Sequence, residues 1–219
     1  MNRFTLAVCA SLLAAATAVP AFAADMPTPF KAPAYAAPFN WSGFYLGING
    51  GYGWGKSSWT DPLSGGTTGD FNLSGAMAGG TVGYNLQTGQ FVLGVEGDID
   101  YSWMTGTDAT GCCQTRNDWF ATARGRLGYA FDRWMPFLTG GAAFGDVKMN
   151  TVGASQTATR VGWTAGGGLE YAFVGAWSAK LEYLYADLGK ASCSAATCGV
   201  TTDVTFKANI VRAGVNYHF

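Results

Sequence analysis

The chain has 219 residues, a formal net charge of −1, 12% charged residues, 48% hydrophobic residues and 32 glycines. A soluble domain typically carries about 25% charged residues, so much of this surface is expected to avoid water. A net charge near zero does not indicate a basic surface that would bind nucleic acid. No stretch after residue 19 is apolar enough to cross a membrane as a helix, so composition argues against a helical membrane protein.

The first 23 residues have the three parts of a secretory signal peptide. Residues 1–3 carry positive charge, residues 4–19 are mostly apolar, and residues 21–23 form a small-x-small cleavage site. The apolar part is interrupted and falls short of the ~20 apolar residues that a spanning helix needs. We therefore predict a signal peptide at 1–23, export of the chain and a mature protein that begins at Ala24.

Residues 24–42 are rich in proline and alanine, with Pro27, Pro29, Pro33 and Pro38. Proline removes a backbone donor and fixes φ, so a regular strand or helix is not expected. We interpret 24–42 as a periplasmic linker, with a proline-rich ligand for another protein as the alternative.

From residue 43 onward the sequence falls into about eight segments in which apolar residues occupy every second position. They lie at 43–55, 71–87, 91–105, 118–131, 135–149, 159–173, 177–189 and 203–219. Short connections at 88–90, 132–134 and 174–176 alternate with long polar ones at 56–70, 106–117, 150–158 and 190–202. This pattern predicts, for 43–219, an all-β, eight-stranded antiparallel transmembrane β-barrel with short periplasmic turns and four long external loops.

The charged residues inside these segments all take the same alternation phase. In the third segment Phe91, Leu93, Val95, Ile99 and Tyr101 share the apolar face, which leaves the acids on the other. A lipid-facing Arg or Lys at the bilayer midplane costs roughly 2–4 kcal/mol, so we place the charges in the lumen. The predicted lumen charge network is Glu96, Asp98, Asp100, Arg124, Arg126, Glu170, Lys180, Glu182 and Arg212.

Within this network we predict the cross-strand pairs Glu96 with Arg126 and Asp98 with Arg124. A second group is expected from Glu170, Lys180, Glu182 and Arg212. In a small barrel such a network would occupy the lumen and exclude a wide aqueous channel. A charged pore lining with ion selectivity is the alternative interpretation.

Aromatic residues gather at both ends of the segments, as in the girdles of outer-membrane barrels. Those near the short turns are Phe44, Tyr84, Phe91, Tyr129, Phe131, Tyr171, Phe173, Trp177, Tyr217 and Phe219. Those near the long loops are Tyr52, Trp54, Tyr101, Trp103, Trp119 and Tyr185. A soluble lipocalin-like barrel would instead place its aromatics inside and its charges outside.

Four cysteines follow the signal peptide, all in expected external loops: Cys112, Cys113, Cys193 and Cys198. Cys193 and Cys198 enclose a short loop and could form a disulfide, but sequence leaves three connectivities open. These loops contain no histidine, so we expect no metal site. The only histidine is His218, next to the carboxyl terminus, so we expect neither an enzyme nor a cofactor.

The last strand resembles the insertion signal of bacterial outer-membrane barrels, with Val215, Tyr217 and the terminal Phe219 on one face. Residues 39–55, 136–145 and 215–219 look like the small major outer-membrane proteins of alphaproteobacteria, often grouped as a porin family of outer-membrane β-barrels. The resemblance covers essentially the whole mature chain and implies a surface-exposed Gram-negative envelope protein. It implies an eight-stranded barrel and surface exposure more firmly than any activity. Members of the family are regarded as abundant envelope proteins involved in membrane integrity, lipopolysaccharide packing and contact with hosts, and the porin label is not proof of conduction.

The sequence thus predicts a structural barrel of the bacterial outer membrane that supports envelope integrity and surface contact. A narrow porin-like channel for ions or small solutes is the first alternative, and an adhesin or host-interaction protein acting through the external loops is the second. The expected partners are outer-membrane lipids and lipopolysaccharide, the assembly machinery during insertion and a host or surface ligand at the loops. The loop ligand and the oligomeric state stay open.

Overall fold

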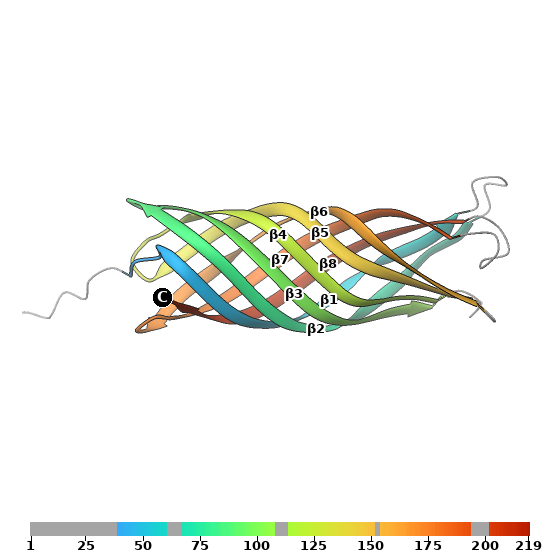
Figure 1. Cartoon of the computed structure of the whole chain (residues 1–219), viewed down its shortest axis with the longest axis horizontal. Coiled ribbons are helices and arrows are strands. Elements are labelled where there is room, and N and C mark those ends of the chain that lie inside the picture. The colour runs from blue at the N-terminus through green and yellow to red at the C-terminus, as the bar shows by residue number, and fades with distance from the viewer. Residues whose placement is uncertain (1–38, 61–66, 108–113, 152–153, 194–201) are drawn as a thin grey trace, which may run out of the picture. The chain divides into compact units, whose positions relative to one another are not determined.

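The computed structural model describes residues 39–60, 67–107, 114–151, 154–193 and 202–219. It contains eight strands: β1 (Gly43–Thr60), β2 (Thr67–Thr88), β3 (Phe91–Thr107), β4 (Gln114–Tyr129), β5 (Trp134–Thr151), β6 (Ala154–Val174), β7 (Trp177–Cys193) and β8 (Thr202–His218). Each strand pairs with its neighbours in sequence, and β1 pairs with β8, so the sheet closes into a barrel (Figure 1). All these pairings are antiparallel, which confirms the predicted fold class. Among the described residues there is no helix of the length and apolarity that a membrane crossing needs.

Three tight turns, at residues 89–90, 130–133 and 175–176, join strands at one end of the barrel, which we call the turn end. Gly89 and Gly175 have φ of 62° and 54°, and Asp132 has φ of 56°. Tight hairpins need positive φ in their central residues, and Gly and Asp adopt it most readily. The opposite end, at which β1, β3, β5 and β7 finish and β2, β4, β6 and β8 begin, is the loop end.

The strands are longer than the sequence predicts, and the expected loops are correspondingly shorter. β1 continues to Thr60 and β2 begins at Thr67, although 56–70 was expected to be loop. β5 and β6 are separated by only residues 152–153. Alternation of apolar residues ends where one face of a strand stops meeting lipid, but backbone pairing continues beyond that height. The sequence pattern therefore marks the apolar band and not the ends of the strands.

Outward and inward residues alternate as a membrane barrel requires. In β3 the side chains of Phe91 and Ile99 are 60% and 64% exposed, whereas Val92 and Asp100 are fully buried. The exposed large hydrophobics include turn-end aromatics Phe44, Phe91, Tyr129, Phe131, Phe173, Trp177, Tyr217 and Phe219, and loop-end aromatics Tyr52, Trp54, Tyr101, Trp103 and Trp163. The apolar surface thus lies outside the barrel, and the polar and charged mid-strand residues lie inside.

The barrel interior contains three layers of side chains in order along the strands. In β7 the inward residues are Ser178, Lys180 and Glu182, followed by Leu184, Ala186 and Leu188 toward the loop end. The ionic layer is the set of nine residues predicted as the lumen network, all of them buried. The loop-end core comprises Phe71, Leu73, Met77, Met104, Phe120, Ala143, Val147, Leu184, Ala186, Leu188, Val204, Phe206, Ala208 and Ile210. The turn-end cap comprises Trp41, Val92, Ala130, Met135 and Ala172, with Phe39 packed against them.

The turn-end cap corrects the expected boundary of the linker. Residues 39–42 were assigned to the linker 24–42, but Trp41 is fully buried and belongs to the compact unit that starts at Pro38. Burial of the indole removes a large apolar area from water, although its Nε1 has no hydrogen-bond partner among the described residues. The predicted signal peptide at 1–23 and the rest of the expected linker lie outside the described residues.

Candidate functional site

Arg124 on β4 is the centre of the ionic layer. Its guanidinium donates to Glu96 on β3, to Asp98 Oδ2 at 2.8 Å and to Glu182 Oε1 on β7 at 2.6 Å. The side chains of these residues have at most 1% of their surface exposed. A single cation therefore joins β3 and β4 to β7 across the lumen.

Arg212 on β8 forms a second junction beside the first. It donates to Asp98 at 2.9 Å, to Asp100 Oδ2 at 2.8 Å and to Glu182 Oε2 at 2.8 Å. Gly51 on β1 gives this side chain its room, because a Cβ atom there would lie 2.6 Å from Cβ of Arg212. An inward glycine thus faces a large inward neighbour, as expected where a small barrel must contain a long side chain.

Arg126 and Lys180 complete the layer on the side of the turn end. Arg126 donates to Glu170 Oε2 at 2.7 Å and to the Tyr45 hydroxyl at 2.9 Å, and Lys180 donates to Glu96 Oε2 at 2.8 Å. The Tyr45 hydroxyl in turn donates to Glu96 at 2.6 Å. The Arg126 guanidinium also lies over the ring of Phe137, 4.4 Å from its centroid. Tyr45 and Phe137 were not predicted as site residues, although both have the inward phase of their strands.

The ionic layer is densely paired but not neutral. Its five carboxylates face four cations, and neutral donors contribute further: Thr122 donates to Asp98, and Ser178 and Asn216 donate to Glu170. Within the described residues, Asp100 Oδ1 is a buried oxygen without a hydrogen-bond partner. Removing charges from water costs several kcal/mol per ion, and only close pairing with additional hydrogen bonds offsets that cost.

The predicted pairing register is wrong by two residues. Glu96 lies opposite Arg124, and Arg126 lies opposite Gly94. The Arg126–Glu96 contact exists at 3.6 Å, and Asp98 reaches Arg124, but both run diagonally. The cause is the strand end: the sequence pattern extends the fourth segment to Phe131, whereas β4 ends at Tyr129. The two expected groups are also one network, since Arg124 and Lys180 connect them.

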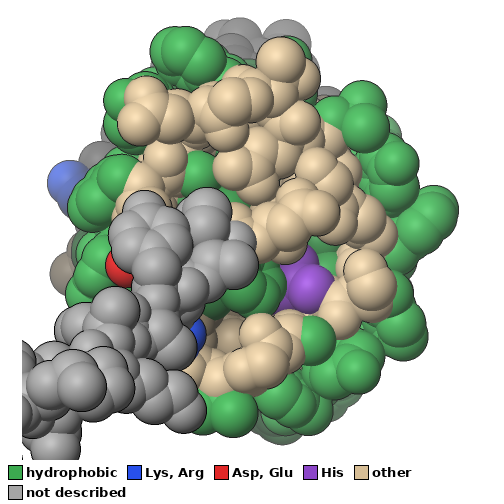
Figure 2. All heavy atoms as spheres, turned by 90° about the vertical axis from the view of Figure 1, so that its left-hand side faces the viewer, with side chains coloured by type: hydrophobic (Ala, Val, Ile, Leu, Met, Phe, Trp, Pro, Cys, Tyr) green, Lys and Arg blue, Asp and Glu red, His purple; other side chains and the backbone are tan. Residues whose placement is uncertain are grey.

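The turn-end cap closes the lumen below the ionic layer. Trp41 donates its backbone N–H to Gln87 Oε1 at 2.8 Å, and Gln87 donates its own N–H to Ser42 Oγ at 3.0 Å. The rings of Phe39, Trp41 and His218 meet edge to face, with centroids 4.7 to 5.6 Å apart. Figure 2 views this end and shows the histidine inside the ring of strands. Residues 39–42 thus hold an aromatic group against the mouth of the barrel.

His218, Ser178 and Glu170 lie together but lack the geometry of a catalytic triad. The Ser178 hydroxyl donates to Glu170 at 2.6 Å and lies 3.0 Å from His218 Nε2. Glu170 faces the same Nε2 at 3.5 Å, while Nδ1 has no partner among the described residues. In a triad the acid must bind the second ring nitrogen and orient the base. All three side chains are also buried, so no substrate carbonyl can approach the hydroxyl.

The loop-end core is the feature that the sequence analysis missed. Leu184 and Leu188 share the inward phase of Lys180 and Glu182, and Ile210 shares that of Arg212. The signal was therefore present as a change from charged to apolar residues within one face. Phe71, Phe120 and Phe206 pack with these aliphatic residues above the charges.

The remaining predicted sites lie at the barrel surface or outside the described part. Val215, Tyr217 and Phe219 point outward, and Phe219 N–H donates to the Phe44 carbonyl at 2.9 Å. The side chains of Cys112, Cys113, Cys193 and Cys198 all lie outside the described residues. No group of three or more His, Cys, Asp or Glu residues is placed to hold a metal ion within the ranges that the structure covers.

Known proteins match this chain over nearly its whole length. Residues 8–219 match the family described as outer membrane protein beta-barrel domain. The 31 kDa outer-membrane immunogenic protein of Brucella melitensis is 38% identical over 94% of this chain and 97% of that protein. The 25 kDa outer-membrane immunogenic protein of Brucella abortus is 34% identical over 93% and 92%.

A relative that matches over a shorter stretch and a solved structure extend the comparison. The 22 kDa outer membrane protein of Rhizobium leguminosarum is 34% identical over 68% of this chain and 64% of that protein. The crystal structure of Neisserial surface protein A covers 81% of this chain and 98% of that one, with 17% identity and a TM-score of 0.47.

Proposed function

The chain belongs to the outer membrane protein β-barrel family, and on that premise we propose that it is a non-enzymatic structural protein whose filled interior conducts no solutes. Its place is the bacterial outer membrane, as for its relatives. Barrels of this class carry short turns on the periplasmic side and longer loops outside. We therefore orient the turn end toward the periplasm.

The observation that carries this proposal is the stacking of three filled layers in the lumen. An ion that moved inward from the loop end would have to pass Phe120, Leu184 and Phe206, each at most 2% exposed. It would then meet the paired charges and finally Trp41. An interior of eight strands is just wide enough for side chains, and the three buried layers therefore support a lumen without a water-filled path.

The ionic layer also supports a structural role because it cross-links strands that are distant around the barrel. Arg124 of β4 bonds to β7, Arg212 of β8 bonds to β3, and Arg126 of β4 bonds to β6. Each bond opposes the separation of two strands that are not neighbours in the sheet. The barrel is thus stabilised from within, while the outward surface stays apolar for lipid.

Single-channel recording in a planar bilayer tests the proposal. The refolded wild type is expected to give no steady openings. Steady openings whose ion preference shifts on Arg124→Ala, but not on the outward control Leu127→Ala, would establish the narrow-channel function instead. Both substitutions lie on β4, so they differ in the face that they change and not in the strand.

A second candidate is a surface-contact protein that acts through the external connections. The Brucella relatives are named outer-membrane immunogenic proteins, which favours exposure of this surface to a host. Removal of residues 194–201 from the connection between β7 and β8 separates the two candidates. Loss of cell attachment with an intact barrel would support the contact function, and unchanged attachment would count against it.

A further inference from the structure

A groove runs along the outward surface of β6, β7, β8 and β1 in the half of the barrel nearer the turn end. Its floor consists of small residues: Ala213 lies opposite Leu181 on one side and Gly50 on the other, and Ala179 lies opposite Val215. The hollow has a volume of about 740 Å³. Three further grooves on the outward surface are smaller, at about 510, 520 and 320 Å³.

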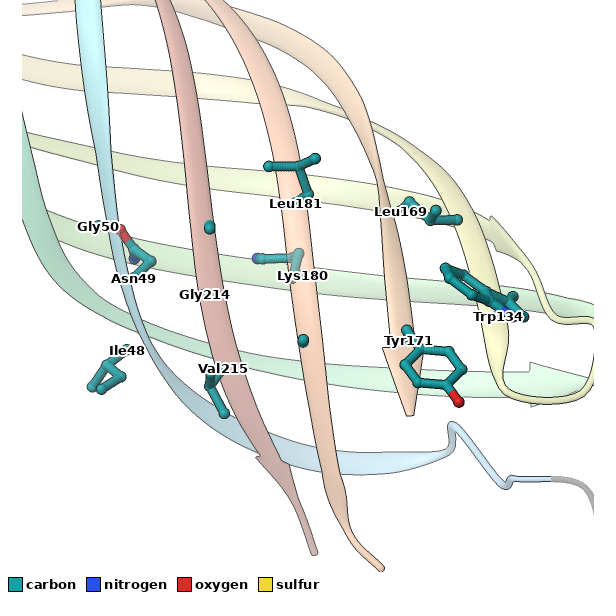
Figure 3. Close-up of a pocket in the computed structure, with 12 residues that line it drawn as sticks. Ile48, Asn49, Gly50, Trp134, Leu169, Tyr171, Lys180, Leu181, Gly214 and Val215 are labelled. Atoms are coloured by element: carbon teal, nitrogen blue, oxygen red, sulfur yellow. The ribbon is translucent and has the colours of Figure 1, made fainter. Parts of the chain in front are cut away.

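Large apolar side chains form the walls of this groove (Figure 3). Trp134 from β5 and Tyr171 from β6 stand together on one side, with ring centroids 4.4 Å apart. Ile48 from β1 and Val215 from β8 stand on the other side. An elongated hydrocarbon, longer than one side chain, would contact both walls and the small residues between them.

The turn between β4 and β5 supplies charge next to the groove. Arg133 directly precedes Trp134, and its guanidinium donates to the Phe173 carbonyl at 2.9 Å, two residues beyond Tyr171. That bond uses one of the five N–H donors of the guanidinium. Asp132, the neighbouring residue, is exposed and carries the opposite charge. One end of the groove thus offers a cation and an anion at the height of the aromatic girdle.

We propose that this groove binds one zwitterionic phospholipid of the periplasmic leaflet. An acyl chain lies over Gly50, Ala179 and Ala213, the phosphate meets Arg133, and the headgroup ammonium meets Asp132. Guanidinium groups bind phosphate through paired charge-assisted hydrogen bonds, and aromatic residues sit at headgroup depth. The inference goes beyond the proposed function and rests on the membrane location alone, so a conducting barrel would leave it intact.

Native mass spectrometry of the folded barrel, titrated with palmitoyl-oleoyl phosphatidylethanolamine, tests the groove. The wild type is expected to saturate with one tightly retained lipid. In the double variant Gly50→Leu with Ala213→Leu, two leucines occupy the floor. Affinity is expected to fall about tenfold or more because the chain loses its apolar contact.

Gly140→Leu is the matched control for the groove variant. A Cβ at Gly50 or at Gly140 meets only a backbone oxygen, at 3.7 and 3.6 Å, so both positions accept a Cβ atom at ordinary contact distance. The control is expected to bind lipid as the wild type does. Equal retention by the groove variant, or an equal loss in the control, would overturn the proposal.

Two further comparisons test the proposed contacts of Arg133 and Asp132 with the lipid headgroup. Arg133→Gln is expected to lower the affinity for phosphatidylethanolamine several-fold and to leave the retention of diacylglycerol, which lacks phosphate, unchanged. Wild-type protein is expected to prefer phosphatidylethanolamine to phosphatidylglycerol, and Asp132→Asn should remove that preference. If the wild type shows no preference, Asp132 does not bind the headgroup and this assignment is wrong.

Discussion

Replacement of Arg212 by methionine removes one cation that three buried carboxylates share. Asp98, Asp100 and Glu182 all lie 2.8 to 2.9 Å from its nitrogens. Methionine has a similar length, so the change removes charge and hydrogen bonds more than volume. The layer would then hold five carboxylates against three cations. Breaking a buried ion pair by removing one partner typically costs about 3–5 kcal/mol of stability. We expect Arg212→Met to lower the free energy of unfolding by an amount in that range.

Lys207→Met provides the control on the same strand. Its side chain is 52% exposed and its ammonium lies 3.9 Å from Asp187, so the two form a surface pair. Exposed pairs contribute about 0–1 kcal/mol. Substitution by methionine is therefore expected to lower the free energy of unfolding by several kcal/mol at Arg212 and by almost nothing at Lys207.

The free energy of unfolding can be measured by urea titration of the barrel in lipid vesicles, followed by tryptophan fluorescence. The loss in Arg212→Met should shrink in acid, because protonation of the carboxylates removes the uncompensated negative charge. Adding Asp100→Asn to Arg212→Met should restore part of the stability. If Arg212→Met and Lys207→Met lose the same small amount, the ionic layer does not stabilise the barrel and our reasoning fails.

Three other predictions use the same unfolding assay or an insertion assay. Trp41→Ala should cost about 3–5 kcal/mol by emptying the turn-end cap, and Trp54→Ala, at a site 43% exposed on the outside, should cost clearly less. Leu184→Ala should cost about 2–5 kcal/mol by opening a cavity in the loop-end core, while the outward Leu138→Ala should cost less because lipid can refill the space. Deletion of Phe219 should slow assembly by the insertion machinery without lowering the stability of barrels that have already folded. An unchanged assembly rate would show that Phe219 is not part of the insertion signal.

The alternation of apolar residues was sufficient to predict the closed barrel and the side on which each charge lies. Period-two patterning fixes which face a side chain takes as soon as one face is known to meet lipid. It does not fix where a strand stops, because pairing continues through segments with water on both faces. The misplaced end of β4 shows the consequence: extending the strand from Tyr129 to Phe131 shifted the pairing of Glu96 from Arg124 to Arg126.

Two parts of the interior were harder to predict for different reasons. The loop-end core was predictable, since Leu184 and Ile210 share the inward face of Glu182 and Arg212. The prediction used only the charged residues of that face and left out the apolar ones. The turn-end cap could not be read from alternation, because Trp41 precedes the first strand and follows a proline-rich segment. Its burial depends on the width of the barrel mouth, which no local pattern encodes.

The three layers depend on one another for a physical reason. The ion pairs are strong only where water is excluded, and the loop-end core and the turn-end cap exclude water from the two ends of the ionic layer. The same low dielectric makes every unpaired buried charge costly, so the layer needs many partners for each ion, as Arg124 and Arg212 have. A conducting pore would need the opposite arrangement, with hydrated charges and wet ends. In the function that we propose, the ion pairs that stabilise this barrel also close it.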